Sequence, residues 1–296
     1  MITPRRFRAL AAVTAVSGYL QIVLGALVRV SGSGLGCPDW PTCYGRLYPP
    51  ANLHSILEYS HRTNGALFGL LLIVTVAAGF WLYRGGPVAW LSSTTLAVVV
   101  GEGLLGWQVV ANLLAPVLVL VHLAIALLIL ALLVGIVILA VPSARSGETG
   151  RSVYRTGLAA SAATYVMLLS GGSVVATRAD DVCKAWPLCG GGFAVDLSNP
   201  AAFDVLHRGL VFFVSLLLVY LLLRSRTALA WLTLVLLVAQ IAVGAVTAVT
   251  SDLAFFQGLH VALASAIFAG VVGVTVLARP QEAATARAPR ALEAAR

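Results

Sequence analysis

The chain has 296 residues, of which 60% are hydrophobic and only 10% are charged, and its mean hydropathy is +0.96. Soluble domains are about 45–50% apolar and about 25% charged, so this composition excludes a water-soluble globular protein. The length leaves no room for a large catalytic domain outside a membrane. The net charge of +8 comes almost entirely from arginine, and in a membrane protein such an excess sets topology rather than binding nucleic acid.

Eight apolar stretches follow one another, each near or above the ~20 residues that cross a hydrocarbon core about 30 Å thick. The arginines before the first stretch resemble the start of a signal peptide, but the stretch is too long and further spans follow, which indicates a retained helix. The predicted fold class is an all-α integral membrane protein with eight transmembrane helices. They are expected at 9–30, 57–83, 88–110, 115–141, 155–177, 201–223, 228–249 and 253–278.

Most arginines lie in the segments that share a side with the two termini, including 1–8, 145–155 and 279–296. The positive-inside rule therefore predicts that both termini are cytoplasmic. The Ala- and Arg-rich tail 281–296 has no lasting apolar face, and we expect it to be a mobile cytoplasmic segment.

All four cysteines then fall in the two longest outward loops, as Cys37 with Cys43 and Cys183 with Cys189. The outer compartment permits disulfides, so each pair is predicted to form one. A zinc site is the alternative, although the spacing is wider than in a zinc knuckle and no histidine is close in sequence.

An internal repeat relates these loops, because CPDWPTC at 37–43 and CKAWPLC at 183–189 share Cys, Trp, Pro and Cys. The chain is therefore predicted to form two four-helix bundles, residues 1–150 and 151–280. Four crossings in each make this a parallel repeat. The offset of 146 pairs Tyr19 with Tyr165, Gly25 with Gly171, Glu58 with Asp204, His61 with His207 and Arg62 with Arg208, and an offset of 138 pairs Gly106 with Gly244, His122 with His260 and Glu102 with Gln240.

Four of the five histidines belong to the repeat, whereas His54 has no counterpart and is expected at the surface. The four lie six to eight residues after residues typical of a helix start, which places them at one depth, roughly 9–12 Å inside the outer helix ends. Polar groups in lipid are costly and persist mainly for function. The four helix starts are Ser55, Pro116, Asn199 and Asp252.

The histidines pair as His61 with His122 and His207 with His260, and facing imidazoles in a helical bundle fit the two axial positions of a haem iron. Zinc or copper also accept imidazole, but each pair then lacks a third ligand unless Glu58 or Asp204 supplies it. Nearby arginines are candidates for holding haem propionates or for reaching the headgroups. These are Arg62 and Arg208, with Arg29 and Arg178 at helix ends.

Two kinds of acidic residue accompany the histidines. Glu58 and Asp204 each stand three residues before a histidine and share its helix face, where a carboxylate can move protons or orient the imidazole. Ser55 and Glu58 also read as a capping box, which needs no chemistry. Glu102, deep in the third span, is a functional candidate for proton passage because intramembrane acids are costly.

Four segments resemble the haem A synthase (Cox15/CtaA) family, and the resemblance covers nearly all of the chain apart from the tail. It implies a bacterial cytoplasmic membrane enzyme that oxidises the C8 methyl of haem O to a formyl group for assembly of an aa3-type terminal oxidase. The segments are LGALVRVSGSGLGCPDWPTCYG at 24–45, LEYSHRTNG at 57–65, VLHRG at 205–209 and QGLHVALA at 257–264, with His122 between them.

The resemblance also implies residue roles. The N-terminal half holds the substrate haem, with Glu58, His61 and His122 as catalytic residues, and the C-terminal half holds haem b on His207 and His260. Cys37 and Cys43 match the loop cysteines of the family, whereas the second cysteine pair is not present in every member and is interpreted as a staple of its loop.

Two other functions fit the same residues. A dihaem electron carrier that oxidises quinol and leaves its haems unmodified suits the four histidines equally well, and a transporter fits the parallel repeat. Expected partners are the lipid bilayer, a haem O synthase that hands over its lipophilic product, and assembly factors of the terminal oxidase. No nucleic acid partner is expected, and an oligomer is compatible with the sequence.

Overall fold

The computed structural model describes residues 2–84, 86–140, 148–187, 189, 199–250 and 253–280. Eight of its helices are long and apolar enough to cross a membrane, which confirms the predicted spans. The predicted helix start at Asp252 and the tail 281–296 lie outside the described residues. The eight are α1 (Pro4–Val30), α2 (Leu53–Tyr83), α3 (Pro87–Ala111), α4 (Pro116–Leu139), α5 (Glu148–Ala176), α7 (Ala201–Ser225), α8 (Ala228–Thr250) and α9 (Ala254–Leu277).

Local capping explains where several helices begin, and it corrects one sequence-based prediction. Proline occupies the first position of α3 and α4, where its missing N–H costs nothing. At α2 the N-cap is Asn52, whose side chain accepts a hydrogen bond of 2.9 Å from the backbone N–H of Ser55. The prediction of Ser55 as the cap was therefore wrong, because an asparagine three residues earlier takes that role.

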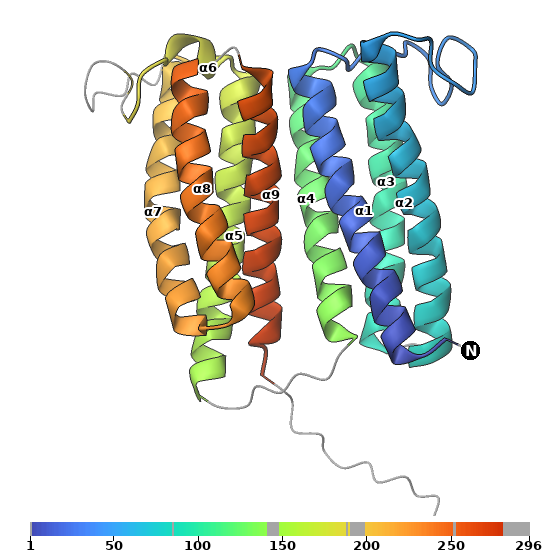
Figure 1. Ribbon diagram of the computed structural model, residues 1–296, viewed down its shortest axis with the longest axis vertical. Coiled ribbons are helices and arrows are strands. Elements are labelled where there is room, and N and C mark those ends of the chain that lie inside the picture. Colours follow the sequence, from blue (N-terminus) through green and yellow to red (C-terminus); the bar gives the residue numbers. More distant parts are fainter. Residues whose placement is uncertain are drawn as a thin grey trace, which may run out of the picture.

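The helices form two adjacent groups of four (Figure 1). In the first group α1 contacts α2 and α4, and α3 contacts α2 and α4; in the second, α5 and α8 each contact α7 and α9. Contacts between the groups join α1 to α9, α4 to α5 and α4 to α9. Exchanging the two groups maps this interface onto itself, which is consistent with the predicted parallel repeat.

Two tyrosines related by the repeat make equivalent hydrogen bonds across this interface. Tyr19 of α1 donates to the carbonyl of Ala262 in α9 at 3.1 Å, and Tyr165 of α5 donates to the carbonyl of Ala124 in α4 at 3.1 Å. Each acceptor lies two residues after a predicted haem-ligating histidine. The interface therefore ties the two histidine-bearing helices α4 and α9 to the opposite group.

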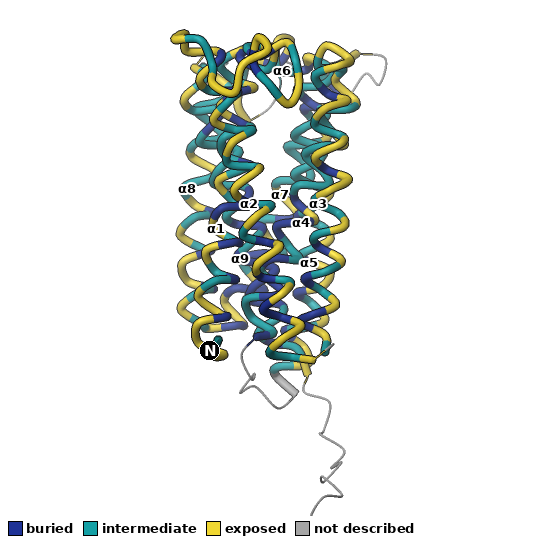
Figure 2. Tube along the Cα trace, turned by 90° about the vertical axis from the view of Figure 1, so that its right-hand side faces the viewer, coloured by how far each residue is buried: buried dark blue, intermediate teal, exposed yellow. Residues whose placement is uncertain are grey.

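Both cysteine loops lie at the end of the molecule opposite the N-terminus, as does the short helix α6 (Ala179–Val182), which the sequence had not indicated (Figure 1). The buried core is concentrated between the middle of the bundles and the N-terminal end (Figure 2). Its largest buried side chains include Leu72, Leu133 and Leu218. Large apolar side chains such as Leu70, Phe213 and Val235 point outward, as lipid-facing residues do.

Candidate functional site

The four repeat-related histidines lie in the half of the bundles nearer the cysteine loops, six to eight residues from the start of their helices. Each occupies a helical stretch in which every residue is described and none is fully buried. The side chains are therefore densely packed between the histidines and the N-terminal end of the bundles, and less densely packed at the level of the histidines. These stretches are 59–67, 116–126, 205–213 and 259–264.

A glycine on the preceding long helix faces each histidine ring. A Cβ added to Gly25 would stand 3.1 Å from Cε1 of His61, and one added to Gly171 would stand 3.0 Å from Cε1 of His207. The same distances are 3.3 Å for Gly106 and His122 and 3.0 Å for Gly244 and His260. Both units thus place each imidazole in a cradle that an alanine methyl would fill, which explains why glycine recurs at these positions.

Each histidine also has a polar partner on the helix that carries its glycine. Nε2 of His61 lies 3.3 Å from the amide nitrogen of Gln21, and Nδ1 of His122 lies 3.0 Å from a carboxylate oxygen of Glu102. Asn64 in turn donates to the amide oxygen of Gln21 at 2.8 Å. The sequence had not indicated Gln21, because its repeat counterpart is a methionine at 167.

The second unit repeats the scheme with different partners. Ser170 lies 2.8 Å from Nδ1 of His207, and the amide nitrogen of Gln240 lies 3.3 Å from Nε2 of His260. The offset of 138 had identified Gln240 as the counterpart of Glu102 but not its contact with His260, and Ser170 was missed because its counterpart is a leucine at 24.

The donor set fits haem. His61 lies close enough to His122, and His207 to His260, for their charges to interact. Buried Nδ1 atoms of His61, His122 and His260 have no hydrogen-bond partner within the described chain, so each of these rings has a nitrogen that a ligand can use. Among the described residues no group of three histidine, cysteine or carboxylate side chains converges as metal ligands, so Glu58 and Asp204 do not complete a three-ligand set.

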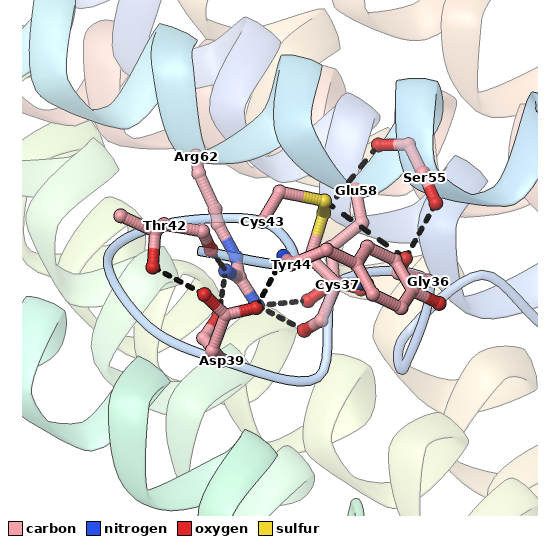
Figure 3. Close-up of polar contacts among 9 residues, drawn as sticks. All are labelled: Gly36, Cys37, Asp39, Thr42, Cys43, Tyr44, Ser55, Glu58 and Arg62. Atoms are coloured by element: carbon pink, nitrogen blue, oxygen red, sulfur yellow. Dashed lines mark hydrogen bonds and ion pairs between the residues drawn. A yellow bond between two sulfur atoms is a disulfide. The ribbon is translucent and has the colours of Figure 1, made fainter. Parts of the chain in front are cut away.

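Glu58 and Arg62 fasten the first cysteine loop over this level of the bundle (Figure 3). Glu58 is 3% exposed, accepts a hydrogen bond of 2.7 Å from the backbone N–H of Cys37 and forms an ion pair with Arg62. The guanidinium also donates to three loop carbonyls, those of Cys37, Asp39 and Thr42. The capping-box interpretation of Glu58 was wrong, since its carboxylate binds the loop rather than the start of its own helix.

The loop also has internal order. Cys37 and Cys43 form the predicted disulfide, with Cα atoms 4.6 Å apart. Asp39 accepts hydrogen bonds from the Thr42 hydroxyl and from the backbone N–H of Gly45 at 2.8 Å. Together with a further bond from the backbone N–H of Tyr44, these lower the pKa of Asp39 to about 2. The loop is thus a compact structure held to α2 by two charged side chains.

Asp204 and Arg208 build the equivalent clamp in the second unit. The guanidinium pairs with the carboxylate at 2.6 Å and donates to the carbonyls of Cys183, Ala185 and Pro187. The predicted pair of Cys183 with Cys189 is at disulfide distance, with Cα atoms 5.0 Å apart. Both arginines therefore have loop partners that the sequence did not reveal, and their contact with haem propionates stays a prediction.

Two further polar residues lie at the same end of the molecule. Arg29, in the last turn of α1, interacts electrostatically with Asp180 of α6 across the interface between the groups. His54 is exposed, as expected, and its Nδ1 lies 3.0 Å from the Ser33 hydroxyl. His54 lies outside the repeat-related set.

Comparison with known proteins adds an independent line of evidence on the family of this chain. The family model COX15-CtaA, described as cytochrome oxidase assembly protein, matches residues 8–272. The chain belongs to this family. The match covers all eight long helices except the first residues of α1 and the last of α9, so it includes every residue of the site described above.

Relatives of similar length share this sequence at low identity. A protein of Alkalihalophilus pseudofirmus is 28% identical over 295 residues, covering 93% of this chain and 99% of its own length. One of Halalkalibacterium halodurans is 28% identical over 89% of this chain and 94% of its own, and one of Shouchella clausii is 27% identical over 88% and 92%. All three are named Heme A synthase.

Proposed function

We propose that this protein is a haem A synthase, a membrane oxidoreductase that converts the C8 methyl of haem O into the formyl group of haem A for assembly of aa3-type terminal oxidases. The family match over residues 8–272 carries the proposal, and relatives that span the whole architecture under the name Heme A synthase support it. The two glycine-cradled histidine pairs supply ligands for two porphyrins, one substrate and one cofactor.

We assign the substrate to the first unit. His61 and His122 hold the iron of haem O, while Glu58 lies on the helix face of His61 one turn nearer the loop. The second unit holds haem b on His207 and His260, and haem b when bound supplies one-electron redox chemistry. The asymmetry between Glu58, which binds both Arg62 and the loop backbone, and the shorter Asp204 supports placing the proton chemistry in the first unit.

The protein's own groups then have distinct tasks. Oxidation of the methyl would run through an alcohol to a geminal diol that loses water; with water as the oxygen donor, each step would release two protons and pass two electrons, one at a time, to haem b. Glu58 is the buried carboxylate placed to take up the protons. The clamped loop covers the site and restricts water, and the glycine cradles fix the imidazoles. Arg62 and Arg208 are proposed to reach haem propionates from the loop level as well.

The membrane setting follows from the substrate and the helices. Haem O carries a farnesyl chain, so we propose that it enters laterally from the bilayer, after handover from a haem O synthase. The excess of arginine on the side of the termini supports cytoplasmic ends, with the cysteine loops and histidines toward the outer face of a bacterial cytoplasmic membrane.

Haem extraction tests the proposal. The protein is expressed in cells that supply haem O, and the extracted porphyrins are separated by chromatography and weighed by mass spectrometry. A formyl haem that depends on the protein is the expected result. Unmodified haem alone, at full haem loading, would refute the synthase and leave the dihaem electron carrier.

Glu58→Gln sharpens the test, because the amide keeps the size of the side chain and one acceptor oxygen for the Cys37 N–H. We expect haem binding to persist and conversion to stop. Ser55→Ala is the matched control, since it removes another contact of α2 with the same loop, a hydrogen bond of 2.5 Å to the Gly36 carbonyl, and leaves the carboxylate. An unchanged haem A yield in the Glu58 variant would remove this acid from the mechanism.

A further inference from the structure

Glu102 is the one acidic partner among the four residues that contact the repeat-related histidines. It lies in α3, is 9% exposed, and points one carboxylate oxygen at Nδ1 of His122 from 3.0 Å. The contact is at ion-pair distance, and neither oxygen has a well-aligned hydrogen-bond partner in the described part of the chain. A carboxylate in an apolar span is costly, so this contact calls for an explanation beyond packing.

The second unit has an amide where the first has this carboxylate. Gln240 of α8 corresponds to Glu102 by the offset of 138, as His260 corresponds to His122. Its amide nitrogen lies 3.3 Å from Nε2 of His260, while its oxygen has no partner among the described residues. The other two partners, Gln21 and Ser170, are also uncharged. The two units therefore place a polar side chain at the same helix position behind the histidine, and they differ in its charge and in the ring nitrogen that it faces.

The character of such a partner changes a metal-ligating histidine. A carboxylate that accepts the Nδ1 hydrogen bond fixes the tautomer, orients the ring with Nε2 toward the metal and makes the imidazole a stronger donor. A stronger axial donor stabilises the ferric over the ferrous iron and lowers the reduction potential. A neutral amide has a weaker effect, because it carries no negative charge.

We propose that Glu102 is a positioning residue for His122 that makes the iron in the first unit harder to reduce than the iron in the second, where Gln240 takes the same place. The inference rests on the proposed function only in that both histidine pairs bind haem. A ferric state favoured at the substrate site suits an oxidation carried out there, and a higher potential in the second unit suits a group that accepts electrons.

A reciprocal exchange tests the proposal. Glu102→Gln is made in a full-length chain whose His207 and His260 are alanine, and Gln240→Glu in one whose His61 and His122 are alanine, so that each protein reports one site. The proteins are produced in cells that make no haem O, placed in lipid nanodiscs and titrated with iron protoporphyrin IX. Midpoint potentials and the electron paramagnetic resonance spectra of the ferric haem are then compared with the unexchanged parents.

We expect Glu102→Gln to lower the ferric-to-ferrous ratio at a fixed potential at least tenfold, which corresponds to a rise of about 59 mV for one electron. Gln240→Glu should shift the other site the opposite way, and Glu102→Asp should retain part of the effect. The spectra should change with the potentials, because both report the donor strength of the axial imidazole.

The outcomes separate the alternatives. An unchanged potential and spectrum in Glu102→Gln would overturn the proposal and leave Glu102 a role such as proton passage. If that variant does not retain haem, Gln240→Glu decides by itself, since a potential that does not fall would overturn the proposal equally. Failure of the wild-type protein to form haem A, with the shifts as expected, would refute only the proposed function.

Discussion

Replacing Gly25 by alanine tests whether the histidine cradles set the geometry of the site. The new methyl would stand 3.1 Å from Cε1 of His61, whereas carbon atoms pack best at about 3.5–4.0 Å. The imidazole must therefore retreat from α1 by roughly 0.4–0.9 Å, which also disturbs its contact with Gln21. A misplacement of about 1 Å can reduce a rate about 100-fold, so we expect haem A formation to fall about ten- to hundredfold.

The folding stability of this variant should change little. Overpacking costs about 1–3 kcal/mol, but the ring lies in a loosely packed stretch and can move. Alanine also gains up to about 1 kcal/mol over glycine in helix propensity. A loss of activity with an unchanged melting temperature would therefore point to ligand geometry rather than to unfolding.

Gly69→Ala is the matched control, because it lies in the same helix as His61 and an added Cβ meets nothing within 4 Å. It gains the same helix propensity without displacing a ligand, and haem A formation should stay at the wild-type level. Gly106→Ala, with 3.3 Å to His122, should have a milder effect than Gly25→Ala. The assay is the haem A to haem O ratio in extracts, together with the Soret band. A wild-type rate and spectrum in Gly25→Ala would refute the cradle.

The cysteine loop allows three further tests. Arg62→Ala breaks a mostly buried ion pair and leaves three loop carbonyls without their donor. We expect the free energy of unfolding to fall by an amount at the lower end of about 3–5 kcal/mol, because the partner carboxylate stays buried without a counter-charge. Proteolysis of the loop should become faster, and Arg62→Lys should restore part of the resistance. Gly36→Ala places a Cβ 2.5 Å from the backbone of His54, and the resulting displacement of the loop should lower the melting temperature. Gly45→Ser is the comparison, because Gly45 has open space around it but a φ of 71°, so this substitution should only loosen the turn. The pKa of Asp39 is lowered from 3.8 to about 2, so the contribution of its carboxylate to loop order is complete above pH 4 and should disappear as the pH falls through 2. Hydrogen exchange of the Gly45 amide would detect this change. Loss of protection already near pH 5 would contradict the prediction.

The main features of the architecture were predictable because their signals are local or repetitive. Hydropathy over ~20 residues is enough to find a span, and the eight predicted spans agree with α1 to α5 and α7 to α9 within several residues. The paired offsets of 146 and 138 identified equivalent residues without any knowledge of packing. Helix rise then predicted one depth for the four histidines, and the structure has them six to eight residues from the starts of their helices.

What the side chains touch was not predictable in the same way. The spacing of Ser55 and Glu58 allowed a capping box beside a role in proton transfer, yet Asn52 caps the helix and Glu58 binds the loop. From its place beside His61, Arg62 was a candidate for contact with haem propionates or with the headgroups, and neither interpretation included the three loop carbonyls to which it donates in the structure. Loop contacts depend on how residues 37–43 fold back over α2, and no periodicity encodes that path.

Sequence by itself therefore determined the number of spans, the twofold plan and the level of the histidines, because apolar length, internal repetition and helical rise each act along a single chain segment. Only the tertiary structure decided which partner stands behind each imidazole. That choice depends on how far each helix rotates about its axis, which is set by the packing of many side chains from neighbouring helices. Packing thus turned Glu102 toward Nδ1 of His122 and Gln240 toward Nε2 of His260, contacts that the offset of 138 did not by itself predict.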